Sequence, residues 1–152
     1  MRGIESTAAR VCRIALVFFV VFYGAWEALA GIGTGILVDD INGLAASERA
    51  AAAPLVEEFN DNILIRAFGV LGSIGSVAFI AAAIGAGVAL HREAGAPVAV
   101  AVLLGLSGFL ITAHPPPYGP VGLALFNAAV LLLVRSQAAR AAPARVTQPG
   151  PA

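Results

Sequence analysis

The chain has 152 residues, of which 59% are hydrophobic and only 12% are charged, and its mean hydropathy is +0.89. A soluble domain has about 25% charged residues, so this chain has too little polar side-chain surface to cover a water-soluble globule. The formal net charge is zero, and no run of basic residues forms the positive surface that nucleic-acid binding requires. These totals predict an integral membrane protein and argue against a nucleic-acid partner.

Residues 14–38 form a long apolar run with one acidic residue, Glu27. The run exceeds the roughly 20 residues that cross a bilayer. Three arginines precede it and two aspartates follow it, so the positive-inside rule places its start in the cytoplasm and its end outside. The basic head and the small residues after Trp26 also fit a cleavable signal peptide. We favour a retained helix, because the sequence stays apolar through Val38.

Residues 39–62 form the long polar segment of the chain, with six acidic residues and a single arginine, Arg49. This excess of acid predicts an external loop between the first and second spans. Within it we expect a short helical turn that Ser47 caps and Pro54 ends.

Three further apolar segments follow, at about 63–90, 97–113 and 120–135. Most arginines fall between or beyond these segments on the side assigned to the cytoplasm. The pattern predicts an all-α fold, a four-transmembrane-helix bundle with up-down topology and with both termini in the cytoplasm. We expect residues 1–135 to form one membrane domain and residues 136–152 to form a disordered cytoplasmic tail.

Small residues recur four positions apart on one helix face in the first two spans. Lipid gives apolar side chains no reason to leave one another, so membrane helices associate where small residues let their backbones approach. The predicted packing positions are Gly24, Gly31 and Gly35 in the first span and Gly69, Gly72 and Ser76 in the second.

Glu27 is the main candidate for chemistry, because an ionised side chain at the centre of a bilayer costs roughly 2.5–3.5 kcal/mol. It shares the small-residue face, so we expect it to point into the bundle, where Tyr23 can hydrogen-bond it. Arg66 is its candidate ionic partner, and we predict a buried Glu27–Arg66 pair. Two alternatives stay open: a titrating proton or cation site, and a protonated, hydrogen-bonded acid. Asn127 is expected to donate a hydrogen bond between helices.

The hydropathy pattern and the segment His-Pro-Pro-Pro-Tyr-Gly-Pro-Val-Gly-Leu at 114–123 resemble small uncharacterised bacterial membrane proteins with four helices. This resemblance implies a fold and no activity. The chain is also similar to the small multidrug resistance exporters, which have four helices and an essential glutamate in the first. The long acidic segment 39–62, the nearby Arg66 and the strong arginine bias depart from that family.

The sequence contains no hydrolase, phosphate-binding or paired-histidine motif, so we expect no enzymatic activity, no cofactor and no metal site. All nine basic residues are arginine, and alanine and glycine abound, as in proteins from GC-rich bacterial genomes. Our leading hypothesis is a non-enzymatic accessory or envelope component of the bacterial cytoplasmic membrane. Its expected partners are the lipid bilayer and a second copy or another membrane protein. The alternative is a small proton-coupled transporter that uses Glu27.

Overall fold

A computed structural model describes residues 4–64, 66, 69–113 and 116–141. These residues form five helices, and the prediction of an all-α fold is confirmed. The first helix runs without interruption from Thr7 to Asn42 and contains two π-helical turns. Its parts are α1 (Thr7–Phe18), η1 (Phe19–Tyr23), α2 (Gly24–Glu27), η2 (Ala28–Gly33) and α3 (Thr34–Asn42). The other helices are α4 (Ala46–Leu64), α5 (Gly69–Ala94), α6 (Val98–Thr112) and α7 (Tyr118–Ala141).

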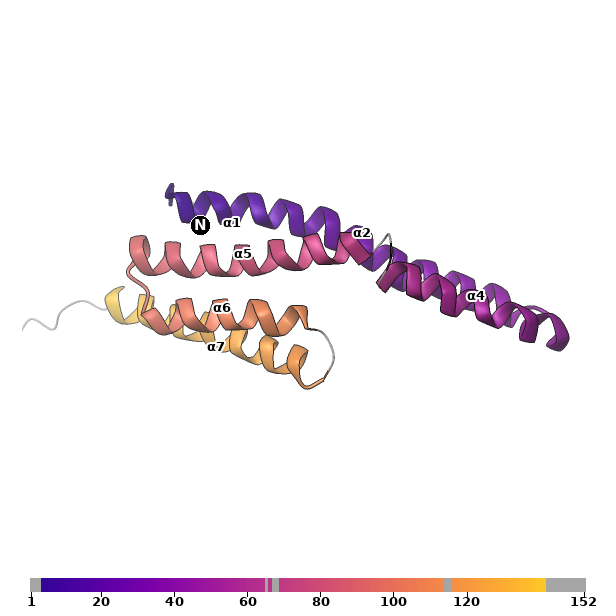
Figure 1. The fold of residues 1–152 in the computed structure, drawn as a ribbon. Coiled ribbons are helices and arrows are strands. Elements are labelled where there is room, and N and C mark those ends of the chain that lie inside the picture. The colour runs from indigo at the N-terminus through magenta and orange to yellow at the C-terminus, as the bar shows by residue number, and fades with distance from the viewer. Residues whose placement is uncertain (1–3, 65, 67–68, 114–115, 142–152) are drawn as a thin grey trace, which may run out of the picture.

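The helices form a bundle from which one helical hairpin projects (Figure 1). Within the bundle α5 is central, because it packs against α1 on one side and α6 on the other, and α6 packs against α7. The end of the first helix leaves the bundle as α3 and pairs with α4. The first helix therefore has two different surroundings along its length.

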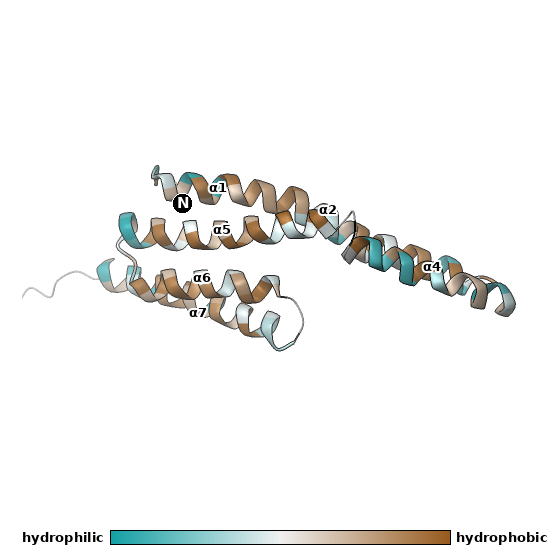
Figure 2. Cartoon of the chain, in the orientation of Figure 1, coloured by the Kyte–Doolittle hydropathy of each residue, from teal (hydrophilic) through white to brown (hydrophobic). Residues whose placement is uncertain are grey.

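Three helices are long and apolar enough to cross a membrane: the first helix, α5 and α7. The apolar helix α6 is shorter, with 15 residues that rise about 22 Å. Figure 2 shows hydrophobic residues along the bundle and hydrophilic residues on α4 and at the ends of α5 and α7. Length and composition thus define a membrane-protein architecture.

The buried positions of the bundle are occupied mainly by small residues, whereas large apolar side chains face outward. Ala9, Ala89 and Ala129 are fully buried, but Val20 and Val77 are 66% and 67% exposed. A water-soluble bundle would bury its large side chains, because apolar burial drives its folding. Small interior residues with large outer ones are instead the pattern of helices that approach closely in lipid.

Residues 39–62, which we expected to be a loop with one short helical turn, are largely helical, because α3 continues to Asn42 and α4 is a 19-residue helix. Pro54 lies inside α4 rather than at the end of a short turn. A proline in a helix interior removes one backbone hydrogen bond, so α4 must gain stability elsewhere. Packing against α3 supplies it: the Phe59 ring lies against Gly33, and Thr34 Oγ1 donates to Asn60 Oδ1 at 3.1 Å. These contacts between α3 and α4 could not be predicted from the helix propensity of residues 46–64.

The opposite end of the bundle is closed by the tight connection between α5 and α6. Gly95 has a φ of +62°, a conformation that glycine adopts without strain. The Arg140 guanidinium of α7 donates to Ala94 O at 2.6 Å and to Gly95 O. The helix α7 continues to Ala141, so its last six residues belong to the segment 136–152 that we expected to be a tail. Residues 142–152 lie outside the described residues.

Candidate functional site

The segment Gly24–Glu27 lies between the two π-helical turns, where the first helix leaves the bundle. π-Helical turns are rare and are frequent at functional sites. This short α-helical segment and the preceding Tyr23 present three side chains with polar groups: Tyr23, Trp26 and Glu27. They form the centre of the candidate site.

Trp26 connects the bundle to the projecting hairpin. Its indole lies on Gly72, where an added Cβ would be 3.1 Å from the ring atoms. Its Nε1 donates to the backbone oxygen of Ile63, at the end of α4, at 3.0 Å. The centroid of its ring lies 5.4 Å from the centroid of the Tyr23 ring. One side chain therefore fixes the start of α5 and the end of α4 against the first helix.

Glu27 is exposed on the single chain, although we expected it to point into the bundle. Successive residues of a helix are separated by about 100°. Because Trp26 faces α5, its neighbour Glu27 is directed away from that contact. The side chain of Glu27 is hydrogen-bonded to that of Tyr23, one turn earlier. The carboxyl group thus lies at the outer surface of the bundle, with the Tyr23 hydroxyl as a partner.

Arg66 is exposed in the bend between α4 and α5. Its backbone N–H donates to Asp61 O at 3.2 Å, and its backbone oxygen accepts from Gly69 N–H at 3.2 Å. Both contacts are made by the backbone of Arg66, so they stabilise the bend and do not test its pairing with Glu27. The Glu27–Arg66 pair therefore stays a prediction.

Asn127 lies on the exposed face of α7. Its Nδ2 donates at 2.9 Å to Leu123 O, in the same helix. We expected a bond to another helix, and the structure instead gives Asn127 a local acceptor one turn earlier. The amide therefore does not contribute through this bond to packing between helices.

The predicted glycine positions behave differently in the two helices. At Gly24, Gly31 and Gly35 an added Cβ would meet nothing within 4 Å, so these positions are open. In α5, Gly72 contacts Trp26, and a Cβ at Gly75 would lie 2.6 Å from Tyr23 Cβ. At Gly72 and Gly75 the first helix therefore packs on α5 through Tyr23 and Trp26, and its own Gly24, Gly31 and Gly35 are left uncovered.

A cleft of about 380 Å³ lies beside Tyr23 and Trp26, between the first helix, α5 and α6. Hydroxyl groups of Ser73, Ser76 and Thr112 contribute polar atoms to its lining. The Ser73 hydroxyl donates to Gly69 O at 2.9 Å, and the Thr112 hydroxyl to Phe109 O at 2.9 Å. Since Tyr23 lines the cleft and bonds to Glu27, its phenol connects the carboxyl group to this polar space.

Sequence reasoning missed the parts that Trp26, Gly75 and Thr112 have in this site. The spacing of Gly72 and Gly75, three residues apart on α5, was a signal for a close helix contact. No comparable signal pointed to Thr112, which meets the cleft only because α6 folds back beside α5.

Within the described part of the chain, no group of three or more His, Cys, Asp or Glu side chains is placed to hold a metal ion. No protein-family model matches the chain, and neither a curated protein nor a solved structure matches it. The fold and composition therefore define its class: an all-α protein with three helices of membrane-spanning length.

Proposed function

We propose that the chain is a four-span protein of the bacterial cytoplasmic membrane, non-enzymatic, that acts by pairing its first helix with that of a second copy. The observation that carries this proposal is an open helix face on which glycines flank an acid. We define this contact face as Gly24, Glu27, Gly31 and Gly35.

The proposed topology places both termini in the cytoplasm, with the short helix α6 as the third of the four spans. Arg10 and Arg13 near the start of α1, Arg92 at the end of α5 and Arg140 at the end of α7 support it. These helix ends belong to the same end of an antiparallel arrangement, as the positive-inside rule requires of a cytoplasmic side. Reporter fusions at either terminus test the topology, and reporters on opposite sides would contradict it.

Leaving the contact face in lipid costs free energy, because the face contains the carboxyl group of Glu27. From Arg13 to Glu27 the helix rises about 21 Å, which places the carboxyl group within a hydrocarbon core of about 30 Å. A charged group there is costly, and the bond from Tyr23 reduces that cost only partly. A second helix that packs closely on the glycines would remove the carboxyl group from lipid.

The geometry suits such a contact. Gly24, Gly31 and Gly35 are all exposed along the first helix, before, within and after its second π-helical turn. Because an added Cβ at each position meets nothing within 4 Å, the backbone surface is accessible to a partner. Two identical faces related by a two-fold axis would give the self-complementary contact typical of homodimers.

The test is energy transfer between donor-labelled and acceptor-labelled copies in lipid vesicles. We expect Gly31→Val to weaken association about tenfold, or about 1.4 kcal/mol, by holding the two backbones apart. The matched control is Ala99→Val, which adds similar volume at an exposed position of α6. Equal association of wild type, Gly31→Val and Ala99→Val would contradict the proposal.

A proton-coupled transporter is the second candidate, favoured by the link from Glu27 through Tyr23 to the polar cleft. Vesicles that contain a pH-sensitive dye would report proton movement driven by an imposed membrane potential. This candidate requires movement by the wild type and by Asn127→Ala, and its loss in Glu27→Gln. Equal rates in all three proteins would exclude Glu27 as the proton carrier.

A further inference from the structure

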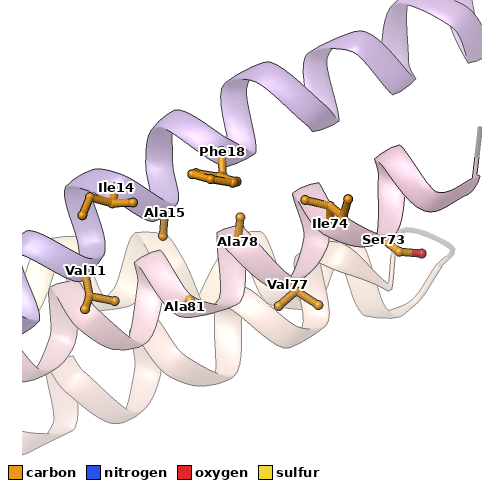
Figure 3. Close-up of a pocket in the computed structure, with 9 residues that line it drawn as sticks. All are labelled: Val11, Ile14, Ala15, Phe18, Ser73, Ile74, Val77, Ala78 and Ala81. Carbon is orange, nitrogen blue, oxygen red and sulfur yellow. The ribbon is translucent and has the colours of Figure 1, made fainter.

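A groove of about 530 Å³ runs between α1 and α5 on the outer surface of the bundle (Figure 3). Val11, Ile14 and Phe18 line it from α1, and Ile74 and Val77 line it from α5. These side chains are apolar, and Ile14 and Val77 are 54% and 67% exposed. The groove is therefore an apolar depression on the outer surface of two neighbouring helices of membrane-spanning length.

The length of the groove matches part of a lipid acyl chain. From Val11 to Phe18 the helix rises about 10 Å, whereas the hydrocarbon of one leaflet is about 15 Å thick. The groove begins beside Arg10 and Arg13, at the end of α1 that carries positive charge. It thus lies in the leaflet next to the basic end of the bundle.

The basic end of the groove supplies charge for a headgroup. Arg10 precedes Ile14 by four residues and so neighbours it on the surface of α1. Arg92 follows Ala81, another lining residue, by eleven residues, or about three turns, and therefore lies on the same face of α5. Both arginines are exposed, and because α1 and α5 are antiparallel neighbours, they lie at the same end.

Acidic residues at this end must be included in the charge balance. Glu5 and Glu93 are exposed there. Arg10, Arg13 and Arg92 outnumber them on the same two helices, so the end carries net positive charge. Basic pockets between transmembrane helices on the cytoplasmic side bind the headgroups of anionic lipids.

We propose that the groove binds one acyl chain of a phospholipid whose anionic headgroup is held by Arg10 and Arg92. The site lies at the start of the first helix, whereas the contact face begins at Gly24. Lipid binding and self-association therefore occupy different parts of the helix, and either one can fail without the other.

The test is native mass spectrometry of the protein released from bilayers of equal amounts of phosphatidylglycerol and phosphatidylcholine. We expect the wild type to retain one phosphatidylglycerol in preference to phosphatidylcholine. The preference should fall about fivefold for each arginine replaced in Arg10→Gln and Arg92→Gln, because each arginine near the surface contributes attraction of that size. Arg135→Gln, at an exposed position of α7, is the charge control and should retain the wild-type preference.

A second pair of variants tests the groove itself. Val77→Trp fills the groove with a bulky side chain, and we expect retained phosphatidylglycerol to fall to the level of the arginine variants. Leu131→Trp adds a similar bulk to α7, where Leu131 is 59% exposed, and should leave retention unchanged. Circular dichroism confirms that each variant keeps its helices. No lipid preference in the wild type, or equal retention by both tryptophan variants, would overturn the proposal.

Discussion

The glycines of α5 and those of the first helix have the same small size, but their surroundings differ. Gly72 and Gly75 of α5 are buried against Trp26 and Tyr23. Gly24 and Gly31 of the first helix face open space. A row of small residues therefore marks a surface able to pack closely, and the fold decides whether the chain itself covers that surface.

The largest effect is expected from filling the packed side. In Gly75→Val the new side chain begins 2.6 Å from Tyr23 Cβ and 2.8 Å from its backbone nitrogen, so the two helices must separate. Overpacking of this kind costs about 2–3 kcal/mol. The free energy of unfolding, measured by denaturant titration in mixed micelles, gives the cost.

The matched change on the open side is Gly24→Val, which meets no atom within 4 Å of the new Cβ. When the protein is dilute enough in micelles to stay monomeric, we expect the free energy of unfolding of Gly24→Val to lie within about 0.5 kcal/mol of the wild-type value. Equal destabilisation by Gly24→Val and Gly75→Val would break the distinction between the two glycine faces.

An intermediate effect is expected at the junction of the two regions. Trp26→Phe keeps an aromatic ring near Gly72 but removes the Nε1 donor to Ile63 O. Loss of one hydrogen bond costs about 1 kcal/mol. Hydrogen exchange should show faster exchange in α4 and little change in α6, and uniform protection of both would contradict the linking role of Trp26.

A smaller loss than that of Gly75→Val or Trp26→Phe is expected within the hairpin. Thr34→Val removes the donor to Asn60 Oδ1, which joins α3 to α4. We expect a loss of about 0.5–1 kcal/mol, because water can replace the bond at a partly exposed position. Hydrogen exchange along α4 measures it, and Thr112→Val, whose hydroxyl donates within α6, is a control that should leave α4 unchanged.

The candidate site could be predicted only in outline from the sequence. Glu27 and Tyr23 are four residues apart on one helix, so a local bond between them could be read from spacing. The direction of Glu27 could not, because it depends on which face of the helix contacts α5. The role of Trp26 depends on Ile63, 37 residues away, and no local pattern reports such a contact.

The sequence by itself determined that the chain is all-α, with long apolar helices separated by charged or proline-containing segments. The physical reason is that a chain in lipid must satisfy its backbone hydrogen bonds internally, so apolar length alone specifies a helix. Only the tertiary structure decided that residues 46–64 are helical, that the glycine face of the first helix is open and that Glu27 is exposed. Those outcomes depend on how helices are rotated against one another, and residues of the same size and spacing permit more than one rotation.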